Sequence, residues 1–158
     1  MTEVPDILTV YAAANPEKPA LICGDDVLTY REYDERSNRA ARALVDLGVE
    51  PGDRVAVMAY NSIAGSEVSA GLRKARTVSV PVNFRLRGEE LAYVVQDSGA
   101  RVVCAGPEFV EHVEAARAQI ETAPVLVAIG DPPHEIRTPG YPQRSEEGGA
   151  PRFRGDPA

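Results

Sequence analysis

The stretch of sequence that decides the fold runs from Arg54 to Ile129. It holds four short and almost wholly apolar segments: RVAVMA (54–59), VSVPV (78–82), VVCA (102–105) and VLVAI (125–129). Helical patterns separate them at 62–75, at 88–98 and after Pro107. Strands that are apolar on both faces are typical of a sheet buried on both sides. The alternation therefore predicts a parallel sheet with right-handed crossovers and helices on both faces.

The residues before this stretch predict a short helix and a β-hairpin. Residues Ile7–Ala14 are rich in apolar side chains, and the pattern ends before Pro16. Two short strands, Ala20–Cys23 and Val27–Thr29, flank the turn Gly24-Asp25-Asp26, whose residue types suit the backbone angles of a tight turn. We therefore expect an α/β fold in which a short N-terminal helix and a β-hairpin precede a mostly parallel βαβαβαβ layer.

A long amphipathic helix is predicted between the hairpin and the sheet. Thr29 and Glu32 have the spacing of a capping box, and Gly48 supplies a left-handed stop. One face of this helix carries Tyr33, Ser37, Ala40, Ala41, Leu44 and Leu47. In the next helix, Gly65 and Gly71 are expected to weaken helix formation.

The composition changes near Gly130. Residues 131–158 hold six of the 13 prolines and four of the 13 glycines, and their only Ile, Leu or Val is Ile136. Such a stretch buries too little apolar area to offset the entropy lost on ordering. We therefore divide the chain into a folded domain at 1–130 and a Pro- and Gly-rich tail or linker at 131–158, expected to be mostly disordered.

Charge and composition exclude several classes of protein. The 158 residues are 44% hydrophobic and 26% charged, with a formal net charge of −7. So acidic a chain lacks the basic surface of a nucleic-acid-binding protein, and anionic membranes repel it. The first residues lack the basic start of a signal peptide, and no apolar run is long enough to cross a bilayer. We therefore expect a cytoplasmic protein with no nucleic-acid partner and no membrane span.

Few residues are candidates for catalysis, phosphate binding or metal binding. The sequence has no glycine-rich phosphate loop, nucleophile elbow or HExxH zinc motif. His112 is expected on a helix surface and His134 in the tail, while Asp25-Asp26 fits a turn better than a paired-carboxylate site. Cys23 and Cys104 lie in apolar runs and are expected to be buried core thiols.

Positive charge gathers at the end of the helix at 62–75 and in the loop after the strand at 78–82. The residues are Arg73, Lys74, Arg76, Arg85 and Arg87. Such a cluster could contact a phosphate-bearing ligand such as coenzyme A. The alternative, which we prefer, is a solvated helix end followed by a basic loop.

Further motifs follow one another in a fixed order. They are NP (15–16) with PALI (19–22), LTYREY (28–33) with SNRAARAL (37–44), LGVEPGDRVA (47–56), and KA (74–75) with VPVNFRL (80–86) and EEL (89–91); DSGAR (97–101) completes the set. Together they resemble the N-terminal segment of the AMP-forming acyl-CoA synthetases, which belong to the adenylate-forming ligase superfamily. The resemblance covers about residues 5–130 and implies an incomplete N-terminal domain of that fold.

The resemblance also implies a reaction. Members of this family transfer AMP from Mg-ATP to a carboxylate, and the thiol of coenzyme A then attacks the mixed anhydride. Their phosphate loop ending in Lys-Gly, their ribose-binding acidic residue and their catalytic Lys would all follow the matched segment. We therefore assign no catalytic, cofactor-binding or metal-binding residue to this chain, and expect ATP, Mg and coenzyme A only for the full-length family.

One departure from the family pattern concerns Arg76. The family usually has Gly in the turn between this helix and the following strand. If the turn requires a positive φ, Arg76 is strained there.

Three functional hypotheses follow. The first is a truncated fragment of an AMP-forming acyl-CoA ligase for fatty or related carboxylic acids, inactive alone, whose partner is the missing remainder. The second is a non-catalytic interaction or regulatory module that pairs with a homologous full-length ligase. The third, an independent small α/β enzyme, ranks last because no nucleophile–base pair or metal cluster is visible.

Overall fold

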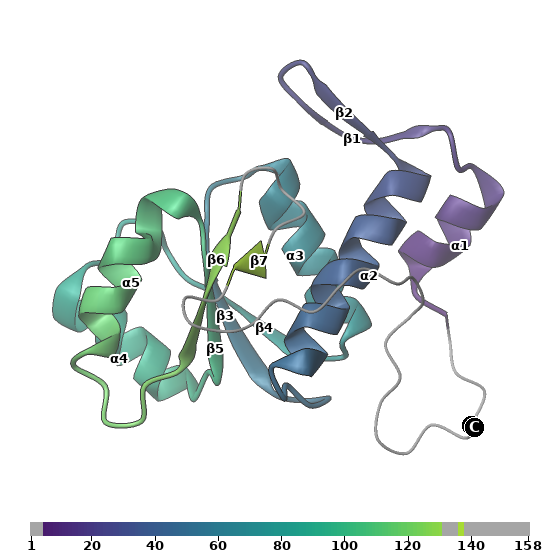
Figure 1. Ribbon diagram of the computed structural model, residues 1–158. Coiled ribbons are helices and arrows are strands. Elements are labelled where there is room, and N and C mark those ends of the chain that lie inside the picture. The colour runs from purple at the N-terminus through teal and green to yellow at the C-terminus, as the bar shows by residue number, and fades with distance from the viewer. Residues whose placement is uncertain (1–4, 131–135, 138–158) are drawn as a thin grey trace.

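The chain forms a five-stranded sheet between two layers of helices (Figure 1). A short helix and a separate β-hairpin come first in the sequence. The computed structural model describes residues 5–130 and 136–137. In chain order the elements are α1 (Ile7–Ala14), β1 (Pro19–Cys23), β2 (Asp26–Thr29), α2 (Tyr30–Asp46), β3 (Arg54–Met58), α3 (Ile63–Lys74), β4 (Val78–Pro81), α4 (Gly88–Ser98), β5 (Val102–Ala105), the 3-10 turn Pro107–Phe109, α5 (Val110–Arg117), β6 (Val125–Ile129) and β7 (Ile136–Arg137).

The predicted parallel sheet is confirmed. The strand order is β4-β3-β5-β6-β7, and the four strands from β3 to β6 are parallel. Strand β7 pairs antiparallel with β6, with Ile136 opposite Ile129. The structure thus adds a short strand within the segment that the sequence suggested as a tail, and the rest of that segment lies outside the described residues.

Both faces of the sheet are covered, as the apolar strands indicated. Figure 1 shows α4 and α5 on one face and α2 and α3 on the other. The first face buries Met58, Leu91, Val103, Phe109 and Leu126, among others. The second buries Leu44, Val55, Leu72, Cys104 and Val127, among others. Consecutive residues of a strand contribute to opposite cores, which explains why few polar residues occur in these strands.

The start of α2 has the predicted capping box. The Thr29 N–H donates to Glu32 Oε2 at 2.9 Å, and the Glu32 N–H donates to Thr29 Oγ1 at 3.3 Å. The helix buries its small face, comprising Ser37, Ala40, Ala41 and Leu44. That face packs against α3, where Gly71 is fully enclosed. Gly71 was expected to weaken α3, but in the structure it lets α2 and α3 approach closely.

The two cysteines lie in different environments. Cys104 is buried in β5, as predicted, and burial raises the pKa of its thiol to about 12. The prediction for Cys23 is wrong, because this residue is exposed at the end of β1. The hairpin β1–β2 is a separate two-stranded sheet, so its apolar residues are not all inside the core. No helix in the described part of the chain has the length and apolar character needed to cross a membrane.

The turn between α3 and β4 has the geometry that the family comparison suggested. Arg76 has a φ of 56°, and it is the only non-glycine residue with positive φ among those the structure describes. Its carbonyl accepts a hydrogen bond from the Gly52 N–H at 2.9 Å, which holds the turn in place. An L-residue in this conformation costs about 1–2 kcal/mol relative to its ordinary backbone angles.

Arg76→Gly is therefore expected to raise the melting temperature. Relief of strain exceeds the added entropy of an unfolded glycine by about 1 kcal/mol, which corresponds to roughly 2–4 °C for a chain of this size. Thermal unfolding followed by circular dichroism measures the change. Arg76→Ala is the matched control, because it removes the side chain but keeps the strained Cβ, and should bring no increase. An equal increase in both variants would contradict the strain argument.

A buried carboxylate lies in the α2–α3 interface. Glu67 is 2% exposed, and its Oε1 accepts a hydrogen bond from Arg36 at 3.3 Å. Desolvation raises the pKa of Glu67, although the charge and hydrogen bond of Arg36 oppose this rise. The folded state therefore binds this proton more tightly than the unfolded state does, and the ionised carboxylate destabilises the fold.

Glu67→Gln is expected to be more stable than wild type at pH 7. The amide oxygen still accepts from Arg36, but no charge is buried. Because the folded-state pKa is the raised one, wild type loses stability as pH rises from about 4.5 through that pKa. The advantage of the variant should thus vanish near pH 4, and urea unfolding at several pH values measures it. Glu114→Gln, at an exposed ion pair in α5, is the control. A stability difference that does not change with pH would contradict the prediction.

Candidate functional site

The topology of the sheet points to one edge. Strand β3 leads into α3 on one face, and its neighbour β5 leads into α5 on the opposite face. Ligands of open α/β sheets bind outside the carboxyl ends of the strands, where the connections diverge in this way. The candidate site is therefore the carboxyl edge at β3 and β5, bordered by the loops at 59–62, 82–87 and 106–109.

The ends of β3 and β5 lie very close together at this edge. The Gly106 N–H donates to the Met58 carbonyl at 2.9 Å. A Cβ on Gly106 would lie 3.5 Å from Ala59 Cα and 3.1 Å from a Glu108 carboxylate oxygen. On the β3 side, Ser62 caps α3, since its Oγ accepts from the Gly65 N–H at 3.0 Å. Both loops are thus fixed where they leave the sheet.

Three aromatic rings meet at this edge, one from each loop, and we call Tyr60, Phe84 and Phe109 the aromatic cluster. The Tyr60 ring centroid lies 5.0 Å from that of Phe84 and 4.8 Å from that of Phe109. The Phe84 and Phe109 centroids are 6.2 Å apart. Phe109 is buried, but Tyr60 is 49% exposed and Phe84 is 36% exposed. The edge therefore presents ring surface to solvent above a buried base.

Two arginines flank these rings. The Arg85 guanidinium lies 5.6 Å from the Phe84 centroid, and that of Arg87 lies 6.0 Å from the Phe109 centroid. Arg87 Nη1 also donates to the carbonyls of Phe84 and Leu86, at 2.6 Å and 2.7 Å. Cations at these distances are attracted by the ring faces. The loop after β4 thus joins positive charge to an aromatic surface.

The rest of the predicted basic cluster is elsewhere. Helix α3 runs back across the sheet, so its last residues lie at the amino edge, a strand length away from Arg85 and Arg87. There Arg73 pairs with Asp6 at 2.7 Å, and Lys74 pairs with Asp34 at 2.7 Å. The five basic residues, which are close in the sequence, therefore do not form one site in the structure.

Lys74 is buried rather than solvated, which corrects the interpretation that we preferred for it. Its side chain is 5% exposed, and Nζ donates to Asp34 Oδ1 and to Asn38 Oδ1 at 2.7 Å and 2.8 Å. Desolvation lowers the pKa of Lys74, against the opposing effect of the Asp34 carboxylate. This lysine fastens α3 to α2, and its donors are already engaged.

The remaining residues singled out in the sequence do not form a site. Asp25 lies in the hairpin turn and Asp26 begins β2, both exposed, as expected of a turn. His112 lies on α5 and is partly exposed, and His134 lies outside the described residues. Within residues 5–130, no three His, Cys, Asp or Glu side chains come together in a way that could hold a metal ion.

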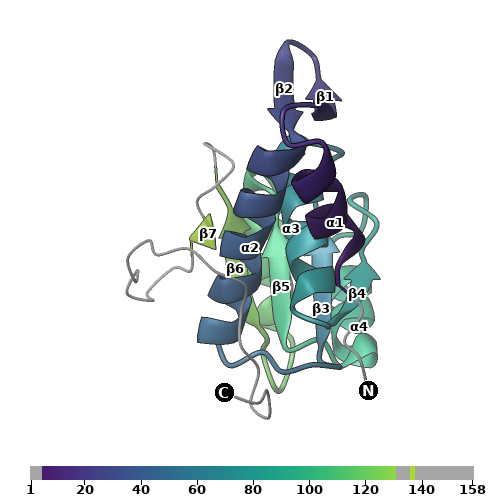
Figure 2. The same ribbon diagram turned by 90° about the vertical axis from the view of Figure 1, so that its right-hand side faces the viewer.

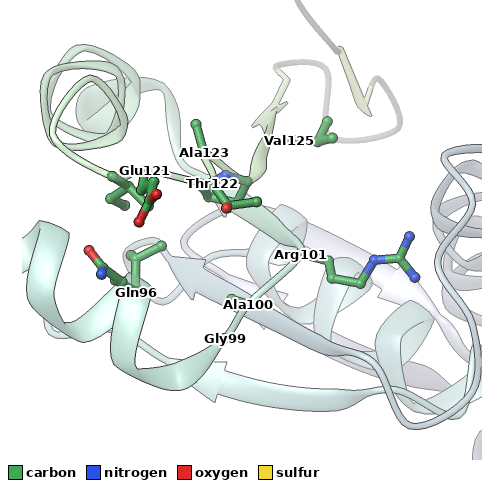
Figure 3. Close-up of a pocket in the computed structure, with 11 residues that line it drawn as sticks. Gln96, Gly99, Ala100, Arg101, Glu121, Thr122, Ala123 and Val125 are labelled. Carbon is green, nitrogen blue, oxygen red and sulfur yellow. The ribbon is translucent and has the colours of Figure 1, made fainter.

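A hollow of about 480 Å³ lies at the opposite, amino edge of the sheet, between α4 and the loop that precedes β6 (Figure 3). Gln96, Glu121 and Thr122 line it, together with the buried Val95 and Ile120. Arg101 also lines the hollow, and its guanidinium pairs with Asp53 Oδ2 at 2.6 Å. The hollow is open to solvent, and none of its polar lining residues is buried.

Comparison with known proteins identifies the family. The model of the AMP-binding enzyme family matches residues 8–151, most of the chain. The chain belongs to this family. This match and the ligases described next confirm the prediction of an acyl-CoA synthetase-like N-terminal segment.

Three similar proteins are ligases or synthetases several times the length of this chain. A fatty acid–[acyl-carrier-protein] ligase of Streptomyces coeruleorubidus is 39% identical over 123 residues, which are 77% of this chain and 23% of the relative. The structure of the anthranilate CoA ligase AuaEII with anthranoyl-AMP matches with a TM-score of 0.73 and 28% identity, over 79% of this chain and 24% of that one. A Mycobacterium tuberculosis fatty acyl CoA synthetase gives 0.71 and 32%, over 77% and 25%. The chain thus spans a quarter or less of the length of these proteins.

Acyl-CoA ligases of the AMP-binding family depend on ATP, Mg and coenzyme A. The described residues do not fit a Mg-ATP site by themselves. The two cations at the end of α3 are neutralised by carboxylates, and no metal-binding cluster is present in the part of the chain that the structure describes.

Proposed function

We propose that this chain forms the first α/β layer of the N-terminal domain of an AMP-forming acyl-CoA ligase that activates a fatty or related carboxylic acid. The family match over residues 8–151 carries the proposal. The Mycobacterium tuberculosis fatty acyl CoA synthetase, which has the same fold at 32% identity over this region, supports it. The names of other relatives, such as a 3-hydroxybenzoate–CoA/4-hydroxybenzoate–CoA ligase of Thauera aromatica, support carboxylate activation in general.

The proposed reaction has two steps, and this α/β layer is part of the scaffold that positions the reactants for both. A carboxylate oxygen attacks the α-phosphorus of ATP, and pyrophosphate leaves. The thiol of coenzyme A then attacks the carbonyl carbon, and AMP leaves with the electron pair of the broken C–O bond. Both steps depend on positioning and charge stabilisation. The part assigned to this chain is to build the carboxyl edge of the sheet.

We also propose that the chain is inactive alone. The resemblance implies a phosphate loop that ends in Lys-Gly and a separate catalytic lysine. The sequence has two lysines, Lys18 and Lys74. Pro19 follows the first and Ala75 follows the second, so neither lysine belongs to a Lys-Gly pair. Lys74 is also held by Asp34 and Asn38. The proposed partner is therefore the remaining part of such a ligase. The cytoplasmic location of the protein stays a prediction. The relatives reported above are ligases, so the alternative role as a regulatory module gains no support from them.

A chimera tests the ligase assignment. Residues 8–130 of this chain replace the matching segment of the Mycobacterium tuberculosis fatty acyl CoA synthetase, and acyl-CoA formation is measured with fatty acids of several lengths. Activity should stay within about tenfold of the parent, equivalent to about 1.4 kcal/mol in the transition state. The same enzyme with the segment deleted is the control. A chimera that folds but forms no acyl-AMP would contradict the assignment.

A second measurement tests inactivity. The 158-residue chain is incubated with Mg-ATP, labelled pyrophosphate and a panel of carboxylic acids. We expect no carboxylate-dependent exchange of pyrophosphate into ATP above that of a heat-denatured sample. Exchange that requires one of the acids would show that the chain is catalytic alone.

A further inference from the structure

Helix α1 buries little apolar surface against the rest of the fold. It lies beside α2 (Figures 1 and 2), yet of its eight residues only Leu8 is buried. Ile7, Val10 and Tyr11 are 61%, 45% and 47% exposed, although the Tyr11 ring also stacks on Tyr30 with the centroids 5.6 Å apart. A helix of this length is marginal in water without tertiary contacts. The polar contacts of α1 must therefore supply much of its attachment.

Those polar contacts meet the last turn of α3. Asp6 caps α1, and its carboxylate accepts from Arg73 Nε at 2.7 Å and from Arg73 Nη2 at 3.3 Å. Thr9 Oγ1 donates to Asp34 Oδ1 at 2.8 Å, and Lys74 Nζ donates to the same oxygen at 2.7 Å. Ion pairs that are bidentate or belong to a network contribute more to stability than isolated exposed pairs do. We call these contacts of Asp6 and Thr9 the latch.

The last turn of α3 leads directly into the strained turn. Arg76, with its φ of 56°, follows Lys74 by two residues. The Arg76 N–H donates to the Arg73 carbonyl at 2.9 Å, and the Thr77 N–H donates to the Leu72 carbonyl at 3.1 Å. The strained residue is thus hydrogen-bonded to the residue with which Asp6 pairs. A backbone in an unfavourable conformation persists only where the surrounding structure holds it there.

We propose that α1 is a strap that holds the turn at Arg76 in its strained conformation, and that release of the latch lets this turn relax. The inference does not depend on the ligase assignment. Its basis is that Arg73 is bonded to α1 through its side chain and to the turn through its carbonyl. The turn is followed by β4, which leads into the loop at 82–87. The strap therefore connects the N-terminal helix to an element that borders the candidate site.

The alternative is that the turn is held from its other side alone. There the Gly52 N–H donates to the Arg76 carbonyl, and the Val78 N–H donates to the Asp53 carbonyl at 2.8 Å. If these bonds suffice, release of α1 leaves the strain at Arg76 unchanged. The two possibilities therefore differ in whether the effect of Arg76→Gly depends on the latch.

A double-mutant cycle on the 158-residue chain distinguishes them. The latch variant carries Asp6→Asn, which keeps a helix-capping side chain without the charge, and Thr9→Val, which keeps the β-branched shape without the hydroxyl. Arg76→Gly is introduced into wild type and into the latch variant, and thermal unfolding of the four proteins is measured. The rise of roughly 2–4 °C expected in wild type should shrink to about 1 °C or less in the latch variant, because the turn has already relaxed there.

Two matched controls separate strain from charge. Arg76→Ala removes the same charge but keeps the Cβ, so it should bring no rise in melting temperature with or without the latch. Glu17→Gln breaks an exposed ion pair with Arg31, at 2.6 Å, that does not involve α3. It should leave the rise from Arg76→Gly unchanged.

Hydrogen exchange shows whether the latch variant releases α1. The Val10 N–H donates to the Asp6 carbonyl at 3.2 Å, and the Asn15 N–H donates to the Tyr11 carbonyl at 2.8 Å. Both amides should exchange roughly fivefold faster in the latch variant than in wild type. If their exchange is unchanged, the polar contacts do not hold α1 and the inference is wrong.

The melting temperatures decide the rest. If Arg76→Gly brings the same rise with and without the latch, or no rise in wild type, α1 does not hold a strained turn and the inference is wrong. If the cycle made with Arg76→Ala shows a coupling as large as the cycle made with Arg76→Gly, charge rather than strain links α1 to the turn. That result would also overturn the inference.

Discussion

Phe109→Ala should lower the free energy of unfolding by about 3–5 kcal/mol, the usual cost of truncating a fully buried Phe. Phe109 is 1% exposed and belongs to the core on the α4–α5 face. It also forms the base of the aromatic cluster, with ring centroids 4.8 Å from Tyr60 and 6.2 Å from Phe84. Its removal takes away both core packing and the contact that orders the two exposed rings. Urea unfolding followed by far-ultraviolet circular dichroism measures the loss, because the chain has no Trp for fluorescence.

The same cluster offers a matched control. Phe84 is 36% exposed, so Phe84→Ala should cost about 1 kcal/mol. The near-ultraviolet signal of the aromatic residues should decrease in both variants, since each breaks ring contacts. If Phe109→Ala costs no more than Phe84→Ala, then Phe109 is not the packed base of the carboxyl edge. That result would contradict the site as described.

Gly71→Ala should destabilise the fold by about 2–3 kcal/mol, as expected of overpacking between two helices. A Cβ on Gly71 would lie 2.6 Å from Ala40 Cβ, 3.0 Å from Ala41 N and 3.1 Å from Ser37 O. Two of these three neighbours are backbone atoms of α2, so no side chain can rotate away to make room. The two helices would have to move apart, and the contacts between them would loosen.

The sign of this effect is the informative part. In a helix that packs against nothing, Gly→Ala stabilises by about 1 kcal/mol through helix propensity. Ser69→Ala, at an exposed position on the same helix, is the control and should stay within about 0.5 kcal/mol of wild type. Thermal and urea unfolding of both variants measure the difference. A Gly71→Ala variant as stable as wild type would show that α2 and α3 are not in close contact.

Local sequence patterns predicted most of the elements. The capping box at Thr29, the apolar strands and the alternation with helices needed only neighbours in the chain, and the structure confirms them. Boundaries differ by a few residues: Ser62 is a cap rather than part of α3, and a 3-10 turn precedes α5. The expectation of positive φ at Arg76 came from a family pattern, and the structure has it.

The candidate site was harder to predict, because it joins loops that are far apart in the sequence. Tyr60, Phe84 and Phe109 carry no spacing that links them, and only the strand order brings them together. The basic cluster shows the converse, because residues that are close in the sequence lie far apart in the structure. Lys74 and Arg85 are near in sequence, but β4 lies between them and places them at opposite edges of the sheet.

The sequence by itself determined the class of fold, the order of the elements and the family, because these depend on the periodicity of apolar residues and on motifs in order. Only the tertiary structure decided which residues of equal local character are inside. Cys23 and Cys104 both lie in apolar strands, yet one strand belongs to a projecting hairpin and the other to the centre of the sheet. Burial depends on what packs against a segment, and the packing partners come from distant parts of the chain.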